Sequence, residues 1–358
     1  MVSTKTGRLG IRAMLATTLL ILALCAAGAI TARAAKPSTE RPAFDPGRPA
    51  IAAFIDAEVA RDGFARAELV ALLGSAQARP ELSAAMTHPI EKTLPWWQYR
   101  ARFVTPGRIA AGLRFWQSHR TQLDPVTKDL GVPSEYLVAI LGMETNYGQS
   151  TGSYRELDTL MTLAFDFPPR AVQYRSELRA FLLLTRDAGL DPLATRGSYA
   201  GALGAPQFLP SSYRRYAVDP AQSGHVDLWT DWAAIFASTA RFLTMHGWER
   251  DRPVVAAVRA GADAHPAVSG RLLLNDTVGG LEAQGLRVEG ALPPATPAVL
   301  VALELEDGPS YRAGFKNTRA LAHYNPSINY VLAVCDLAGE LRQAIEREGP
   351  DAAAPGRP

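Results

Sequence analysis

The sequence predicts a mainly α protein of the α+β class, with a helical body and a small inserted β-containing subdomain. Over most of the 358 residues, apolar side chains recur at intervals of three and four, as they do on one face of an α-helix. Between about residues 252 and 316 this pattern gives way to short segments rich in Val and Leu, separated by Gly and Pro. Hydrophobic residues make up 47% of the chain and charged residues 20%, so we expect a folded rather than a disordered body.

The first 34 residues have the layout of a secretory signal peptide. Three basic residues, Lys5, Arg8 and Arg12, precede an apolar run over residues 13–30, and the small-x-small sequence of residues 32–34 suits a cleavage site. We therefore expect an exported protein from which residues 1–34 are removed.

Two other interpretations of this segment stay open. The apolar run approaches the length that spans a bilayer, so it could remain as a membrane anchor. Lipid attachment at Cys25 is the second alternative, although the large Leu24 before it disfavours that modification.

Removal of this segment changes the charge and the cysteine count. It carries four Lys or Arg and no acidic residue, so the formal net charge falls from +2 to −2. A nucleic-acid partner is then not indicated by charge. Cys335 remains as the only cysteine, so the exported chain forms no intramolecular disulfide.

After the signal peptide, we divide the chain into an extended linker, one large domain and a tail. Residues 35–49 are rich in Pro and polar residues, which is typical of an extended segment. The domain covers residues 50–348, with the β-containing insert at about 252–316, and residues 349–358 are expected to be disordered.

The helices follow from local signals in chain order. Apolar residues from Phe54 to Leu73 predict helices, with Gly63 and Pro80 as stops. Pro133 suits an early helical position before the apolar run that ends at Leu141. A longer helix is expected over residues 170–188.

Helical signals also flank the predicted strands. Thr230 is a suitable N-cap for a helix that ends at Gly247. Strands are predicted at residues 253–260, 285–290 and 298–306, and we expect this insert to lie at the surface. The helical period returns after Asn325 and continues through Cys335.

Glu144 is the first candidate for chemistry, because it ends an apolar helix in "ILGMETNYGQSTG". Partial burial by its own helix face would raise its pKa, so that it could donate a proton to a leaving oxygen. The alternative is that Glu144 only accepts hydrogen bonds from its neighbours. The same stretch contains Gly148-Gln149-Ser150-Thr151-Gly152, but a serine nucleophile in that pattern requires a preceding strand, which the sequence does not provide.

Two further segments have the composition of a sugar-binding groove. "GSYAGALGAPQFLPSSYRRYAVD", residues 197–219, combines glycines and prolines with Ser198, Gln207 and Phe208. "HYNPSIN", residues 323–329, places Tyr324 and Asn325 before a proline, with Tyr330 following. The alternatives are a helix connector for the first segment and local capping by Asn325 for the second.

No metal site is expected. Residues 219–230, "DPAQSGHVDLWT", begin like a calcium loop, but Ala221, Ser223 and Thr230 stand where oxygen ligands and a bidentate acid are needed. The six histidines show no metal-binding spacing.

Taken together, "GMETNYG", "SYAGALGAPQFLPSSYRRYAVD" with "HGW" downstream, and "HYNPSINY" resemble the lytic murein transglycosylase B family of bacterial cell-wall enzymes. The resemblance covers residues 45–345 in order. It implies a lysozyme-like helical catalytic core with a helical N-terminal part, and cleavage of the β-1,4 bond between N-acetylmuramic acid and N-acetylglucosamine. It also implies peptidoglycan glycan strands as the substrate. Together with the signal peptide and the degraded calcium loop, it leads us to expect a periplasmic monomer without a cofactor, with cell-wall synthesis proteins as further candidate partners.

The same resemblance implies the roles of single residues. Glu144 would act as acid and then as base, with the substrate's own N-acetyl group and C6 hydroxyl replacing the second carboxylate that most glycosidases use. The product would end in 1,6-anhydromuramic acid. Substrate-binding positions that match the family are Tyr99, Tyr174, Ser198, Gln207, Phe208, Tyr324, Asn325 and Tyr330. The degraded calcium loop departs from the pattern of family members that have one.

Two alternative functions remain at this point. One is a lysozyme-like muramidase that hydrolyses the same bond with water. The other is a catalytically inactive peptidoglycan-binding scaffold, against which the intact Glu144 and groove positions argue.

Overall fold

The computed structural model describes residues 42–87, 94–261 and 270–348, together with residues 264, 266 and 268. The predicted signal peptide, the first part of the linker and the C-terminal tail lie outside the described residues. The described residues all fall within one structural unit that begins at Pro42. Its helices are each too short or too polar to span a bilayer.

The first helices of the chain pack against two later ones around a shared core. Leu69, Leu73 and Leu82 are buried there with Leu160 and Phe181. The elements of this group are α1 (Pro49–Asp62), α2 (Arg66–Gly74), α3 (Pro80–Thr87), α8 (Glu156–Phe165), the 3₁₀ turn η2 (Pro168–Arg170) and α9 (Ala171–Ala188). Gly63 ends α1 in the left-handed conformation, as its position predicted. Pro80 begins α3 instead of ending a helix, because its fixed φ suits a first helical turn.

The described part of the predicted linker is attached to this group. Phe44 is buried, and its backbone N–H donates to the carbonyl of Ala76 over 3.0 Å. Ala43 forms an isolated β-bridge with Gln77. Residues 42–48 are therefore bound to the domain and not a free spacer.

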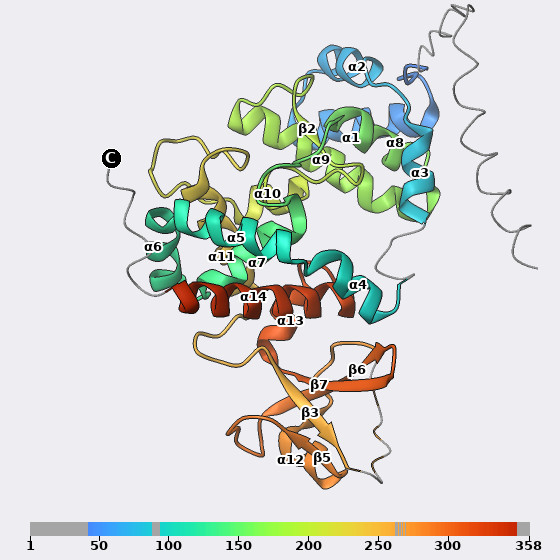
Figure 1. Cartoon of the computed structure of the whole chain (residues 1–358). Coiled ribbons are helices and arrows are strands. Elements are labelled where there is room, and N and C mark those ends of the chain that lie inside the picture. Colours follow the sequence, from blue (N-terminus) through green and yellow to red (C-terminus); the bar gives the residue numbers. More distant parts are fainter. Residues whose placement is uncertain are drawn as a thin grey trace, which may run out of the picture. The chain divides into compact units, whose positions relative to one another are not determined.

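The second group of helices surrounds the long C-terminal helix, α14 (Ile328–Glu348). Val331, Val334, Leu337 and Leu341 of α14 are fully buried, and Figure 1 shows α14 between the other helices and the sheet. Its companions are α4 (Trp96–Phe103), α5 (Pro106–Ser118), α6 (Arg120–Leu130), α7 (Ser134–Thr145), α10 (Pro210–Tyr216), α11 (Trp232–Met245) and α13 (Lys316–Ala322). The N-cap of α11 is Asp231, whose carboxylate accepts from the N–H groups of the first turn, and not Thr230. Thr230 instead donates its hydroxyl to Asp227.

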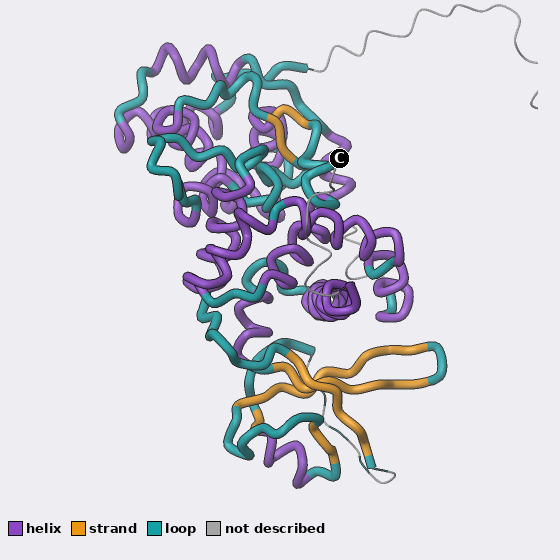
Figure 2. The backbone as a smooth tube through the Cα atoms, turned by 60° about the vertical axis from the view of Figure 1, so that its left-hand side comes forward, coloured by secondary structure: helices purple, strands orange, loops and turns teal. Residues whose placement is uncertain are grey.

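The strands are almost all in one five-stranded antiparallel sheet of order β4-β6-β7-β3-β5, and Figure 2 shows them apart from the helices. Its elements are β3 (Val255–Ala260), β4 (Asp276–Thr277), β5 (Leu286–Val288), β6 (Pro297–Leu305) and β7 (Gly308–Gly314), with the short α12 (Val278–Ala283) against them. The exception is the two-stranded ribbon of β1 (Tyr154–Arg155) and β2 (Arg196–Gly197), which lies among the helices.

Strand β6 is buried on both faces. Ala298 and Leu300 belong to the small core of the sheet, whereas Val299, Val301 and Leu303 belong to the main helical core. Alternate residues of a strand point to opposite faces, so one strand serves two cores. We had expected the insert to lie at the surface. The structure differs, because one face of β6 completes the main core.

A charged cluster also joins the sheet to the helices. Asp336 of α14 accepts from Arg100 of α4 over 2.6 Å and from Arg312 of β7. The side chain of Asp336 is only 10% exposed, so its charge depends on both partners.

We expect Asp336→Ala to lower the free energy of unfolding by about 2–3 kcal/mol, because two charge-assisted hydrogen bonds are lost and the guanidinium group of Arg312 loses its carboxylate partner. Urea denaturation of the purified domain measures this change. Asp124→Ala is the matched control, since its ion pair with Arg120 is exposed and is expected to contribute less than about 0.5 kcal/mol. Equal effects of the two substitutions would contradict the prediction.

Candidate functional site

Glu144 lies in the last turn of α7, a helix whose middle is fully buried. Residues Leu137 to Leu141 have no exposed surface, whereas Glu144 is half-buried. The helix therefore carries its carboxylate from the core to the surface.

Three consecutive residues in the left-handed region end α7 immediately after the candidate acid: Asn146 (φ 50°), Tyr147 (φ 63°) and Gly148 (φ 81°). A tyrosine rarely adopts this conformation, so its side chain must be held firmly. The Tyr147 hydroxyl donates to the carbonyl of Arg108 over 2.9 Å. Its ring lies against Gly142, where a Cβ would approach it within 2.7 Å. The end of α7 is thus fixed by a buried ring.

Two tyrosine hydroxyls lie beside Glu144. Tyr330, in the first turn of α14, is 4% exposed and donates to Oε1 of Glu144 over 2.5 Å. Tyr324 donates to the carbonyl of Pro206 over 2.7 Å, so its hydroxyl faces inward although part of the residue is exposed. Burial raises the pKa of both hydroxyls well above their ordinary value, and the negative charge of Glu144 raises them further. Both groups therefore remain neutral hydrogen-bond donors near neutral pH.

The loop of residues 203–208 is tied to the same helix end. Thr145 donates to the carbonyl of Ala205 over 3.0 Å and accepts from the N–H of Gly148 over 3.0 Å. Gln207, which is itself left-handed at φ 53°, donates to the carbonyls of Thr151 and Gly204. Together with the bond from Tyr324 to Pro206, these bonds place the segments of residues 197–219 and 323–329 beside the end of α7.

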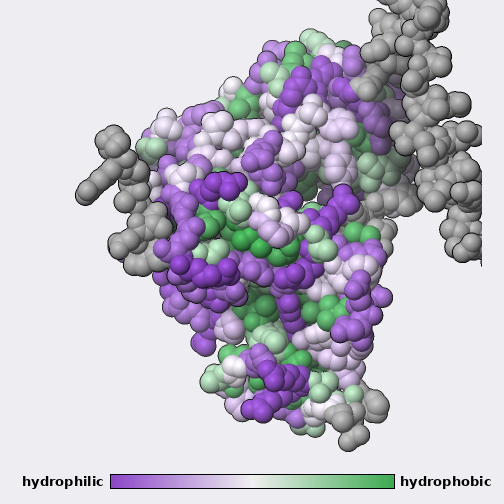
Figure 3. Space-filling view, in the orientation of Figure 1, coloured by the Kyte–Doolittle hydropathy of each residue, from purple (hydrophilic) through white to green (hydrophobic). Residues whose placement is uncertain are grey.

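The structure brings Glu144, Gln207, Tyr324 and Tyr330 together. Apolar residues gather over the region of α5 and α7 on the face that Figure 3 shows. The combination of a half-buried acid, aromatic hydroxyls and apolar surface suits a carbohydrate, which presents hydroxyl edges and flat apolar faces.

Ser198, Tyr174 and Asn325 make local contacts. The Ser198 hydroxyl accepts from the N–H groups of Ala200 and Ala202, which closes a tight turn. Tyr174 donates to the carbonyl of Ala200 over 3.1 Å. Asn325 accepts from the N–H of Ser327, which is the capping role that we had considered for it. Direct contact of these residues with a substrate stays a prediction.

Three aromatic residues that the sequence suggested for the groove are core residues in the structure. Phe208 and Tyr174 are 2% exposed and Tyr99 is 1% exposed. Phe208 packs between the rings of Phe242 and Tyr324. The three rings are therefore part of the core of this structure, and their contact with a substrate stays a prediction.

Ser150 does not occupy a nucleophile elbow. The helix α7 precedes it, and its backbone N–H donates to the carbonyl of Thr145 in the turn that ends this helix. The strand that a serine hydrolase requires before its nucleophile is replaced here by a helix.

The loop of residues 219–230 uses its carboxylates internally. Asp219 accepts from the N–H of Gly224 over 2.7 Å, and Asp227 accepts from the N–H groups of Trp229 and Thr230. Within the described ranges, no three His, Cys, Asp or Glu side chains lie close enough together to hold a metal ion. The residues present do not fit a calcium site.

Comparisons with known proteins agree on one family. The model of the transglycosylase SLT domain family matches residues 47–339. The chain is 36% identical over 293 residues to membrane-bound lytic murein transglycosylase B of Escherichia coli K12, covering 79% of this chain and 80% of that protein. The crystal structure of soluble lytic transglycosylase SltB1 from Pseudomonas aeruginosa superposes with a TM-score of 0.79 at 38% identity, covering 83% and 100% of the two chains. SltB3 from Pseudomonas aeruginosa, solved in complex with NAG-anhNAM-pentapeptide, gives a TM-score of 0.71 at 28% identity, covering 81% and 78%.

A second buried acid, Glu156, was not among the predicted residues. It has no exposed surface, and neither carboxylate oxygen has a hydrogen-bond partner in the described part of the chain. It lies against Gly197 and Gly201, where a Cβ would approach its oxygens too closely. Burial, and secondarily the charge of Glu177, raises the pKa of Glu156 to about 8. The one signal in the sequence that could have indicated a buried acid here is the position of Glu156 directly before the apolar run "LDTLMTLAF".

We expect this group to make stability depend on pH. The folded state keeps a proton that the unfolded chain releases above pH 4.5, so the free energy of unfolding should fall as the pH rises to about 8. The slope is about 1.4 kcal/mol per pH unit within that window. Glu156→Gln should reduce the slope by this amount, and urea denaturation at pH 5, 7 and 9 measures the difference from the parent. Glu282→Gln, at an exposed position of α12, should keep the slope of the parent; if Glu156→Gln keeps it as well, the buried acid is not its source.

Proposed function

Because the chain belongs to the transglycosylase SLT domain family and is a peptidoglycan lytic transglycosylase, we propose that Glu144 performs its chemistry on the bond between N-acetylmuramic acid and N-acetylglucosamine. The observation that carries the proposal is the hydrogen bond from Tyr330 to Glu144, which joins two motifs 186 residues apart. The helical, lysozyme-like fold with a small sheet, which the sequence predicted, is confirmed by these relatives.

In the first step, Glu144 donates its proton to the glycosidic oxygen as the bond from that oxygen to C1 of the muramic acid breaks. Proton transfer from a positioned carboxylic acid makes the departing sugar a neutral leaving group. The N-acetyl group of the muramic acid stabilises the positive charge that develops at C1, so the enzyme does not need a second carboxylate for this purpose.

In the second step, the Glu144 carboxylate accepts the proton of the C6 hydroxyl on the same muramic acid. The oxygen of that hydroxyl then bonds to C1, which closes a 1,6-anhydro ring and returns the proton to Glu144. No water is consumed. SltB3, the relative solved with NAG-anhNAM-pentapeptide, holds a sugar of this anhydro type.

The surrounding residues have positioning roles in this proposal. Tyr330 holds Oε1 of Glu144, so the carboxyl group keeps one orientation through both steps. Gln207 and Tyr324 fix the 203–208 loop through backbone carbonyls, including those of Gly204 and Pro206. The substrate would lie along the surface that this loop and the end of α7 form.

Two alternatives give different products. A muramidase would use water and leave a reducing muramic acid, which is heavier than the anhydro product by one water. An inactive scaffold would release nothing. The intact contact between Tyr330 and Glu144 favours an active enzyme.

We further propose a periplasmic location, reached through the N-terminal signal peptide. Of the relatives, one is named membrane-bound and another soluble, so the family contains both forms. Peptidoglycan glycan strands are the proposed partner, and wall-synthesis proteins remain additional candidates.

We expect Glu144→Gln to reduce the release of anhydromuropeptides from purified sacculi by at least about 10³-fold, because both the acid and the base are lost. Mass spectrometry of the digest measures the product and its type. Glu135→Gln, in the first turn of the same helix, is the matched control and should keep parental activity. Full activity of Glu144→Gln would show that another residue is the acid, and a hydrated product from the parent would favour the muramidase.

We also expect chelation to have little effect. Because the 219–230 loop satisfies its carboxylates with its own N–H groups, dialysis against EGTA should change the melting temperature by less than about 1 °C and leave sacculus digestion unchanged. A melting temperature that falls with EGTA and is restored by calcium would overturn this prediction.

A further inference from the structure

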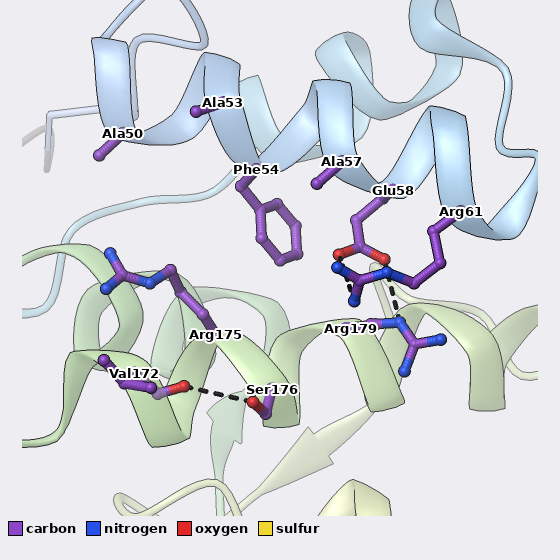
Figure 4. Close-up of a pocket in the computed structure, with 10 residues that line it drawn as sticks. All are labelled: Ala50, Ala53, Phe54, Ala57, Glu58, Arg61, Val172, Arg175, Ser176 and Arg179. Atoms are coloured by element: carbon purple, nitrogen blue, oxygen red, sulfur yellow. Dashed lines mark hydrogen bonds and ion pairs between the residues drawn. The ribbon is translucent and has the colours of Figure 1, made fainter.

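A pocket of about 480 Å³ lies between α1 and α9, on elements other than those that carry Glu144. Figure 4 shows the ring of Phe54 in its middle, with Arg175 towards one end and Glu58, Arg61 and Arg179 towards the other. We call it the α1–α9 pocket.

Four of the ten residues that line the pocket have small apolar side chains. Ala53 and Ala57 line it from α1, and Val172, which is 74% exposed, lines it from α9. A valine so exposed beside a concave apolar surface offers contact to small groups such as methyls.

One guanidinium group of the pocket lacks a partner. Arg179 donates to Asp62 over 2.7 and 2.8 Å, and Arg61 lies 3.9 Å from Glu58. Arg175 is partly buried, and within the described part of the chain it has no hydrogen bond or ion pair. A carboxylate is the ligand that would compensate its charge.

The opposite end of the pocket offers an acceptor. Glu58 is 3% exposed, and its Oε2 has no hydrogen bond, although Arg179 is within ion-pair range at 3.3 Å. Burial raises the pKa of Glu58 to about 7, so its negative charge is reduced near neutral pH and the pocket stays positive overall. An N–H donor of a ligand would satisfy this oxygen.

We propose that the α1–α9 pocket binds an acidic peptide with small side chains, of the kind that peptidoglycan stems present. Such a peptide supplies a carboxylate for Arg175, N–H groups for Glu58, and methyl groups for the contacts with Ala53 and Val172. The identity of the peptide rests on the proposed function, whereas its chemistry follows from the pocket. The pocket would hold the strand at a point remote in sequence from the cleavage site.

Isothermal titration calorimetry with the sugar-free tetrapeptide L-Ala-γ-D-Glu-meso-diaminopimelate-D-Ala tests this proposal. The parent chain should bind it with a dissociation constant in the micromolar to millimolar range. Arg175→Gln should weaken binding by about tenfold or more, since a charge-assisted hydrogen bond is lost. Ala53→Met should weaken it by filling the pocket without changing its charge.

Arg241→Gln is the matched control, because Arg241 is exposed on α11 outside the pocket, and it should bind as the parent does. Thermal melts establish that each variant is folded. The proposal is overturned if the parent does not bind the tetrapeptide at millimolar concentration, if Arg175→Gln and Ala53→Met both bind with parental affinity, or if acetate binds as tightly as the peptide.

This measurement needs no turnover, so it separates the pocket from the catalytic proposal. If the parent does not digest sacculi while the tetrapeptide binds, the catalytic proposal is wrong and the pocket stands. If digestion succeeds and the tetrapeptide does not bind, the pocket proposal is wrong and the catalytic one is unaffected.

Discussion

The packing of α7 against α14 is the contact on which the rest of the site depends. Residues Leu137 to Leu141 of α7 and Val331 to Leu341 of α14 supply the centre of the main core. The same contact brings the first turn of α14 to the last turn of α7, so that Tyr330 meets Glu144. Burial of apolar surface thus sets the distance between Tyr330 and Glu144 on which the proposed catalysis depends, and no flexible loop has to hold the candidate acid.

The sequence predicted the parts of this arrangement that are local. The apolar run up to Leu141 and the polar break after it indicated where α7 ends and made Glu144 a candidate. The helices around residues 170–188 and after Asn325 followed from periodicity, and α9 and α14 confirm them. Tyr330 could be associated with Glu144 only through family resemblance, because a spacing of 186 residues carries no geometric information.

Other features depended on tertiary packing and could not be predicted. The left-handed Tyr147 is possible because Gly142 leaves room for its ring. Strand β7 was missed because its seven residues, "GPSYRAG", contain few apolar ones. The burial of Phe208 and Tyr99 could not be predicted, because an aromatic ring looks the same in sequence whether it faces a sugar or a core. Glu156 and Glu58 are a second example, because the sequence around an acidic residue does not reveal whether its carboxylate is buried.

Strand β6 gives the insert a different status from that of an appended module. With Ala298 and Leu300 on one face and Val299, Val301 and Leu303 on the other, it is shared between two cores. If the sheet were deleted from the chain, the part of the main core that β6 covers would be exposed to solvent. The insert and the catalytic body are therefore expected to fold and unfold as one cooperative unit, and evolution could vary the loops of the sheet far more freely than it could remove the sheet itself.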